Sequence, residues 1–187
     1  MRPMQRPFSN ILFVVALFIA TLPLAQAHLM VAQHGTLNIV KDSVFMALSL
    51  PISAFAGIDD DNDGNVSMIE FNNHRTTIVE SIKLHIILSD KAGNRLLEGI
   101  MLSPVVPRNT QKEAISQLTV MGRFVLDDAD RSSNTLKFQL GLYGEQSTEQ
   151  SIEITATRKS DNQIHVFELT SMDSVTKLFP DKPPVSQ

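Results

Sequence analysis

The chain has 187 residues, no cysteine, and 20 acidic against 16 basic side chains, which gives a net charge of −4. An acidic balance argues against nucleic acid or an anionic membrane surface as a partner, because both repel negative charge. Without cysteine there is no disulfide and no cysteine for lipid attachment, so packing alone, with or without a metal, has to hold the fold.

Residues 1–27 have the features of a secretory signal peptide. Two arginines precede the apolar run 11–24, and the small-x-small sequence "AQA" ends at Ala27. We expect cleavage there, so that the mature chain begins at His28 in the periplasm or outside the cell. The alternative is an uncleaved anchor, but the run is shorter than the ~20 residues that a spanning helix needs. Cleavage leaves 14 basic against 20 acidic residues, a net charge of −6.

The remaining chain is long enough for one domain, which we expect over residues 28–179, with the proline-rich residues 180–187 as a disordered tail. Segment 29–40 is expected to form one or two strands with a turn at Gly35. Segment 43–50 is apolar on both faces and fits a central strand.

One helix is predicted, over about 67–82. Apolar side chains recur there at spacings of three, seven and four, which places on one face Met68, Phe71, Ile78 and Ile82. Segment 83–102 then reads as a strand, a glycine-containing turn and a second strand. Segment 103–116, with two prolines, favours a loop that could include a short helical turn.

Later segments alternate apolar and polar side chains with period two, which is typical of half-buried strands. They are 117–126, 136–143 and 151–157, and 163–169 is expected to be the last strand. The side chains expected to point inward are Leu118, Val120, Phe124, Leu126, Leu136, Phe138, Leu140, Leu142, Ile152, Ile154 and Ala156. Polar turn-forming connections favour antiparallel neighbours. We therefore expect a mainly β fold, an antiparallel immunoglobulin-like β-sandwich with one inserted helix.

An acidic loop precedes the predicted helix. Residues 59–70 satisfy the spacing D-x-[DN]-x-[DN]-G-x5-E without a mismatch. Alternate carboxylates can converge on one hard cation as the chain curls around it, and Gly64 permits the sharp turn. Calcium, which accepts six to eight oxygens at ~2.3–2.6 Å, suits such a loop better than magnesium, which demands a tighter octahedron. The predicted ligands are Asp59, Asp61, Asp63, Asn65 through its backbone carbonyl, Ser67 directly or through a water, and Glu70.

The loop and the helix after it resemble an EF-hand. Val66 falls where such loops bury an aliphatic residue, and Phe71 lies on the inward face of the helix. The resemblance fails upstream, because Pro51 interrupts the chain and leaves at most one or two turns, roughly 52–56, for an entering helix. EF-hand loops usually work in pairs, and the second acidic segment, 126–134, lacks the glycine and the terminal acid. A single loop of this kind implies weak binding, with a dissociation constant of ~0.1–1 mM.

The order of strand, short apolar turn, EF-hand-type loop, helix and hairpin is similar to the extracytoplasmic domains that accompany some bacterial HupE/UreJ-type membrane proteins. The resemblance implies a bacterial envelope protein and supplies no catalytic residue. On this basis the expected partners are calcium and an envelope or membrane protein.

A second interpretation of the acidic loop needs no metal. Ser67 and Glu70 have the spacing of a capping box, and acids before a helix are favoured by its dipole. This interpretation does not explain the alternation of the three aspartates or the position of Gly64. So much negative charge in one turn costs stability unless a cation offsets it. We therefore favour calcium and keep the capped acidic turn as the alternative.

A different function, copper binding or delivery, would rest on the amino terminus. Cleavage would give His28 a free amine beside its imidazole, and a further histidine would complete a nitrogen site suited to copper. The candidates for that further ligand are His34, His74, His85 and His165.

Motifs for catalysis are missing from the sequence. It contains no G-x-S-x-G, no H-E-x-x-H and no phosphate-cradling glycine loop. We therefore expect a binding protein rather than an enzyme.

Overall fold

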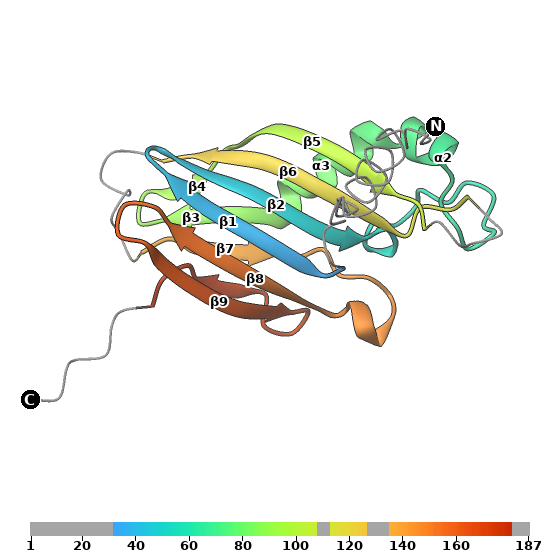
Figure 1. Ribbon diagram of the computed structural model, residues 1–187. Coiled ribbons are helices and arrows are strands. Elements are labelled where there is room, and N and C mark those ends of the chain that lie inside the picture. Colours follow the sequence, from blue (N-terminus) through green and yellow to red (C-terminus); the bar gives the residue numbers. More distant parts are fainter. Residues whose placement is uncertain (1–31, 108–112, 127–134, 181–187) are drawn as a thin grey trace, which may run out of the picture.

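Two β-sheets make up most of the computed structural model, which describes residues 32–107, 113–126 and 135–180 (Figure 1). The larger sheet contains, in spatial order, β5 (Leu97–Val105), β6 (Gln117–Val125), β2 (Ser43–Pro51), β1 (His34–Val40), β8 (Ser151–Arg158) and β9 (Gln163–Thr170). The smaller sheet contains β10 (Val175–Lys177), β7 (Lys137–Leu140), β3 (Ile86–Asp90) and β4 (Gly93–Arg95). Neighbouring strands are antiparallel except β1 and β8, which run parallel. The expected mainly β class is thus confirmed.

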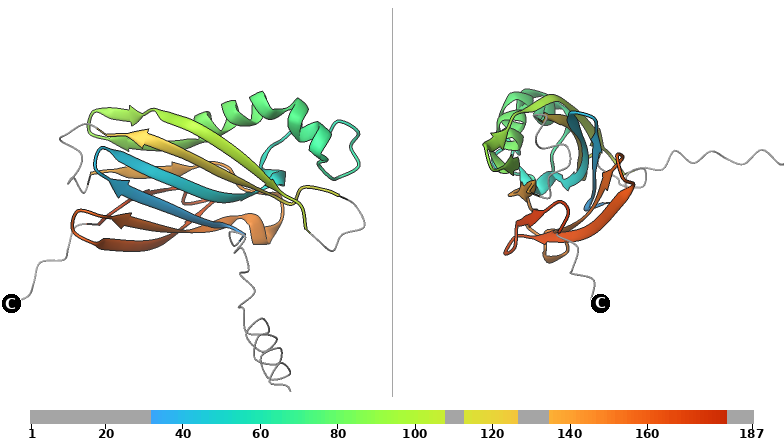
Figure 2. Two further views of the ribbon diagram at one scale, coloured as in Figure 1. Left: turned by 45° about the horizontal axis from the view of Figure 1, so that its top comes forward. Right: turned by 90° about the vertical axis from the view of Figure 1, so that its left-hand side faces the viewer.

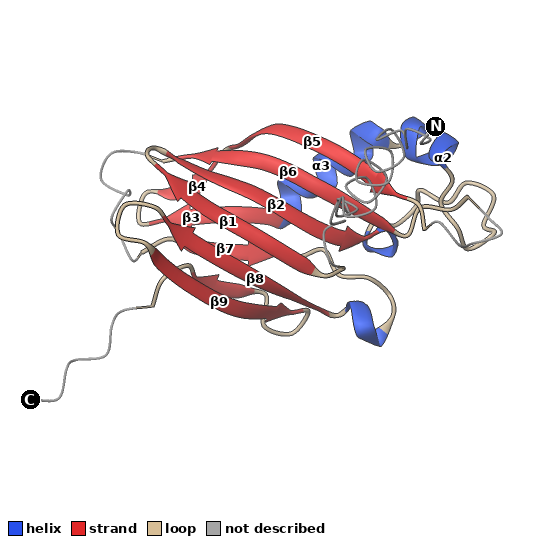
Figure 3. Ribbon diagram, in the orientation of Figure 1, coloured by secondary structure: helices blue, strands red, loops and turns tan. Residues whose placement is uncertain are grey.

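Helices are few and lie at one end and along one side of the strands (Figure 3). They are α2 (Met68–Asn73), α3 (Arg75–His85) and the short 3-10 turns η1 (Ile52–Ala54) and η3 (Ser147–Glu149). Within the described part of the chain, no helix has both the length and the apolar character needed to cross a membrane.

The helix expected over about 67–82 is present as two helices. The chain leaves helical geometry at His74, where φ is −95° and ψ is 9°, and α3 then continues to His85. Residues 83–85, expected in a strand, therefore belong to a helix. Phe71, Ile78 and Ile82 are buried as expected, but Met68 is exposed, because it lies in the first turn of α2 beside the acidic loop.

The two sheets face each other across one hydrophobic core (Figure 2). β2 lies inside the larger sheet and pairs along its length with β1 and β6, as its two-sided apolar character predicted. Every side chain predicted to point inward from residues 117–157 is buried. Period-two alternation therefore identified which face of these strands meets the core.

Some connections differ from the expectation. Gly35 lies inside β1 rather than in a turn, and a Cβ there would come within 2.4 Å of Leu48 Cδ2 on β2. The glycine thus serves close packing between neighbouring strands. Segment 83–102 contributes to three strands rather than two, because Leu96 is not in strand conformation and separates β4 from β5. β10, which no alternation signalled, follows β9, and Phe179 beyond it is buried.

The predicted signal peptide, the acidic residues 127–134 and residues 181–187 of the predicted tail lie outside the described residues.

Phe138→Ala tests the core. Phe138 is fully buried, so truncation should lower the free energy of unfolding by about 3–5 kcal/mol in urea denaturation. Phe45→Ala is the matched control, because Phe45 is 47% exposed on the outer face of β2 and should cost about 1 kcal/mol or less. Similar losses for both variants would contradict a core confined between the sheets.

Candidate metal centre

The segment between β2 and α2 turns back on itself before the helix begins. Gly57, Asn62 and Gly64 have positive φ values of 73°, 56° and 78°. A left-handed backbone strains most side chains, and glycine and asparagine adopt it most readily. The sharp turn predicted at Gly64 is therefore present, and glycine suits the left-handed backbone conformation at this position.

Three carboxylates converge inside this turn. Asp59, Asp61 and Asp63 each offer an oxygen, and these atoms lie within 4.8 Å of one another. Within residues 32–107, 113–126 and 135–180, this is the one group of three or more acidic, histidine or cysteine side chains that could hold a metal ion. Carboxylate oxygens are the ligands that hard divalent cations prefer. The alternate spacing read from the sequence does bring the three aspartates together.

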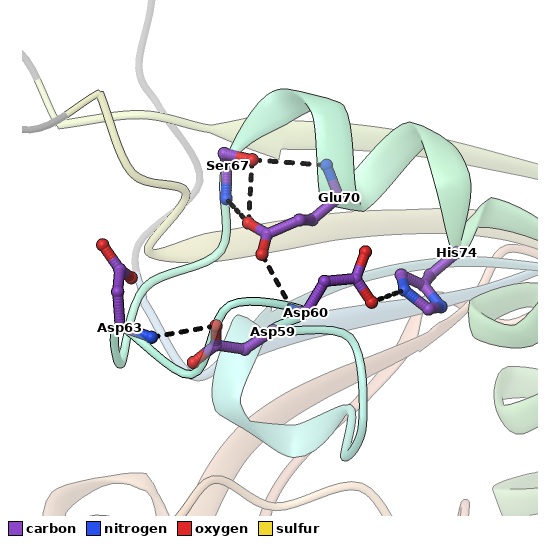
Figure 4. Close-up of polar contacts among 6 residues, drawn as sticks. All are labelled: Asp59, Asp60, Asp63, Ser67, Glu70 and His74. Carbon is purple, nitrogen blue, oxygen red and sulfur yellow. Dashed lines mark hydrogen bonds and ion pairs between the residues drawn. The ribbon is translucent and has the colours of Figure 1, made fainter.

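Backbone amides fix the orientation of these carboxylates, and Figure 4 shows one such bond, from the Asp63 amide to Asp59. Asp59 Oδ2 accepts a hydrogen bond from the Gly64 amide at 2.9 Å, and Asp59 Oδ1 accepts one from the Asp63 amide at 3.3 Å. The Asp63 amide also donates to Asp61 Oδ1 at 3.1 Å, and the Asn65 amide donates to Asp63 Oδ1 at 2.8 Å. These donors offset part of the repulsion between like charges, and the loop is held curled around its carboxylates.

Glu70, the predicted twelfth residue of the loop, has different partners. Its Oε2 accepts hydrogen bonds from the Ser67 amide and hydroxyl, both at 2.8 Å, and its Oε1 accepts one from the Asp60 amide at 2.8 Å. Ser67 Oγ in turn accepts from the Glu70 amide at 3.3 Å, which completes a capping box at the start of α2. The carboxylate of Glu70 is therefore engaged in capping, and it is not a member of the aspartate group.

A surface cavity of about 310 Å³ joins the two parts of the loop. Its lining consists of Asp61, Asp63, Asn65, Ser67, Glu70, Glu113 and Ala114. Five of the six predicted ligand residues thus border one cavity. Asp59 is not part of this lining, but one of its oxygens lies within 4.8 Å of oxygens of Asp61 and Asp63. The side-chain amide of Asn65 donates a hydrogen bond to Asp63 Oδ1 at 3.0 Å, whereas the orientation of the Asn65 backbone carbonyl, the predicted ligand, is not fixed by a hydrogen bond among the described residues.

Glu113 is the residue that sequence reasoning missed. It reaches the cavity because an isolated β-bridge joins Val66 to Ile115, with the Ile115 amide donating to the Val66 carbonyl at 2.8 Å. Both bridge residues are buried. Val66 does occupy an aliphatic, buried position, as the loop pattern predicted. No local signal connects Glu113 to the loop, since the two are far apart in the chain and meet only through this bridge.

The described histidines have partners other than a metal. His74 Nε2 lies 2.7 Å from Asp60 Oδ1 and connects the loop to the junction of α2 and α3. The Nδ1 atoms of His34, His85 and His165 each bond a backbone carbonyl, that of Ala32, Ser81 and Leu178 respectively. His28, on which the copper alternative rests, lies outside the described residues.

Comparison with models of known protein families gives no match for this chain, and a search of curated proteins finds no match.

The hydrogen bonds from Ser67 and the Asp60 amide hold the pKa of Glu70 below its ordinary value. The folded chain therefore keeps Glu70 ionised at pH values where the unfolded chain protonates it. The resulting stability is fully present above the ordinary glutamate pKa, and it is lost as the pH falls through the lower folded pKa.

Glu70→Gln should remove this acid dependence, because glutamine keeps the shape of the side chain without its titration. In a chelator, the difference in free energy of unfolding between wild type and variant should be largest above about pH 5 and shrink towards pH 3. Asp161, whose pKa is also lowered by Arg158, is present in both proteins and cancels from the difference. A difference that stays constant over this range would contradict the assigned hydrogen bonds.

Proposed function

We propose that this protein is an extracytoplasmic calcium-binding protein in which the loop 59–70 holds one ion. The proposed ligands are Asp59, Asp61, Asp63, Asn65, Ser67 and Glu70. The protein would act in the periplasm or outside the cell after cleavage behind Ala27, and its role would be binding rather than catalysis.

The observation that carries this proposal is the convergence of three carboxylates around Gly64. A capped helix start accounts for Ser67 and Glu70, but it gives no reason for three aspartates with oxygens within 4.8 Å of one another. Such a cluster is repulsive without a cation, and exposure of Asp61 and Asp63 leaves it open to one. A flexible all-oxygen site of this kind suits calcium better than the smaller, octahedral magnesium.

Glu70 is the residue for which calcium would compete with the helix cap. Its Oε2 has two donors and its Oε1 has one, so both oxygens can face an ion only if the carboxylate gives up part of the cap. This cost supports weak binding, in the ~0.1–1 mM range of extracellular modules. The capped turn is then the calcium-free state of the same loop.

A structural role for the ion follows from the position of the loop. The loop connects the end of β2 to the start of α2, and its Val66 is bonded to Ile115 just before β6. An ion would therefore tie together three segments that converge at one end of the strands. With ~1 mM calcium and a dissociation constant of ~0.1 mM, mass action would add about 1.4 kcal/mol to the stability.

The bridge from Val66 to Ile115 also supports an EF-hand loop that works alone. Paired loops of this type support each other, and here the segment just before β6 takes the place of the second loop. We further propose that the two facing sheets form an immunoglobulin-like β-sandwich whose surface engages an envelope or membrane protein. The loop type and the order of elements, which are similar to extracytoplasmic domains associated with HupE/UreJ-type proteins, support that assignment.

Calorimetric titration of the metal-stripped chain that begins at His28 tests calcium binding. We expect one calcium site with a dissociation constant of ~0.1–1 mM, weaker binding of magnesium, and loss of calcium binding in Asp61→Asn and Glu70→Gln. Asp60→Asn is the matched control, because Asp60 carries the same charge beside Asp61 but faces His74.

The outcomes of this titration separate the alternatives. No calcium heat up to several millimolar would leave a capped acidic turn. Equal losses in Asp60→Asn and Asp61→Asn would show general attraction to negative charge rather than a coordinated ion. Tight copper binding that disappears when the terminal amine is blocked would move the function to His28.

Glu113→Gln tests whether the bridge to Ile115 contributes to the site. Removing the negative charge of Glu113 from the cavity lining should weaken calcium binding about two- to fivefold. This factor corresponds to the roughly 0.5–1 kcal/mol that an exposed charge contributes to binding free energy. Glu80→Gln, on the exposed side of α3, removes the same charge outside the cavity lining and should have less effect. Equal weakening in both variants in the same titration would assign the effect to net charge.

A further inference from the structure

Three of the four sheet edges in the described part of the chain carry features that block pairing with a further strand. β4 and β10, at the edges of the smaller sheet, have only three residues each. β5, at one edge of the larger sheet, has a bulge between Glu98 and Met101 and a proline at Pro104. Short strands, bulges and prolines are the devices by which natural proteins protect exposed sheet edges.

β9 carries none of these devices. Within the described residues it is the other edge of the larger sheet, with β8 as its single neighbour (Figure 1). All eight of its residues pair with β8 in unbroken register, and it contains no proline, glycine or lysine. In an edge strand alternate residues direct their N–H and C=O groups away from the neighbour. β9 therefore presents an uninterrupted row of backbone donors and acceptors.

Two of the three exposed side chains of β9 are apolar, where a soluble edge is usually charged. Ile164 and Val166 are 64% and 54% exposed, and Glu168 is the single carboxylate of the strand. Both apolar side chains point away from the core, because the alternate residues of the strand, His165 and Phe167, face the other way and pack together. An added strand at this edge would cover apolar surface as well as complete backbone hydrogen bonds.

Contacts at both ends and on its inner face hold β9 in place. At one end Arg158 makes two bonds to Asp161, with Nε–Oδ1 and Nη2–Oδ2 distances of 3.0 and 2.9 Å. At the other end Thr170 and Asp173 exchange backbone hydrogen bonds of 3.0 and 3.1 Å. On the inner face His165 Nδ1 donates to the Leu178 carbonyl at 2.8 Å. An edge fixed in this way loses little conformational entropy when a strand is added.

We propose that β9 pairs antiparallel with β9 of a second copy of this chain, so that two larger sheets join into one. A two-fold pairing of this strand places no two like charges opposite each other. With Val166 opposite Val166 of the second copy, Ile164 lies opposite Glu168 of the second copy, and the four exposed apolar side chains gather around the two-fold axis. In this register the two Glu168 carboxylates are about 13 Å apart along the strands, beyond the screening length of ~8–10 Å.

This proposal does not depend on calcium, because it involves neither the acidic loop nor its cavity. Sedimentation measurements in a chelator, on the chain that begins at His28 and so includes every described residue, should give twice the single-chain mass. Val166→Lys should give a single-chain mass, since it places two lysines face to face at the axis. Met101→Lys, at a residue 58% exposed on the opposite edge strand β5, is the matched control and should remain dimeric.

A cysteine introduced into this cysteine-free chain can form a disulfide only with another copy. Val166→Cys should therefore give a covalent dimer on mild oxidation, whereas Met101→Cys should not; this result decides the matter if circular dichroism shows that Val166→Lys is unfolded. A wild-type chain that is monomeric at micromolar concentrations overturns the proposal. A dimer that survives in folded Val166→Lys, or one in which Val166→Cys fails to crosslink, overturns it as well.

Discussion

Contact between the two sheets has to hold this chain together without covalent help, because the sequence contains no cysteine. The acidic loop takes its position from the same contact. Val66 within the second half of the loop and Phe71 directly after it are buried, and Ile115, which bonds Val66, is buried as well. Attachment at these apolar points keeps the aspartates converged although their charges repel one another. The proposed metal centre is therefore a product of core packing as much as of its own hydrogen bonds.

The carboxylate of Glu70 serves helix capping and is also the proposed metal ligand. Helix capping uses both of its oxygens, through Ser67 and the Asp60 amide, and metal coordination would use the same oxygens. The cap stabilises the start of α2, and on the proposed function its partial loss would set a cost on calcium binding. Weak binding by a loop that is already folded would suit an environment in which calcium is abundant, where the ion would add stability instead of acting as a switch.

The edge strands differ in how well they are protected against pairing with a further strand. A bulge and a proline interrupt β5, and β4 and β10 are short, but β9 pairs with β8 in unbroken register and exposes Ile164 and Val166. The proposed dimer edge and the acidic loop lie in different parts of the molecule, β9 at the lower border of Figure 1 and the loop beside α2. Each proposal therefore stands or falls without the other.

The sequence by itself determined the features that depend on near neighbours in the chain. Period-two alternation identified the buried faces of β6, β7 and β8, and the spacing of Asp59, Asp61 and Asp63 around Gly64 identified the converging carboxylates. Both follow from backbone geometry over a few residues. Tertiary structure decided the rest: that Gly35 makes room for Leu48 instead of making a turn, that β1 runs parallel to β8, and that Glu113 reaches the cavity. Local sequence carries no signal for these, because each depends on which segments become neighbours when the strands assemble into the larger sheet and when Val66 meets Ile115.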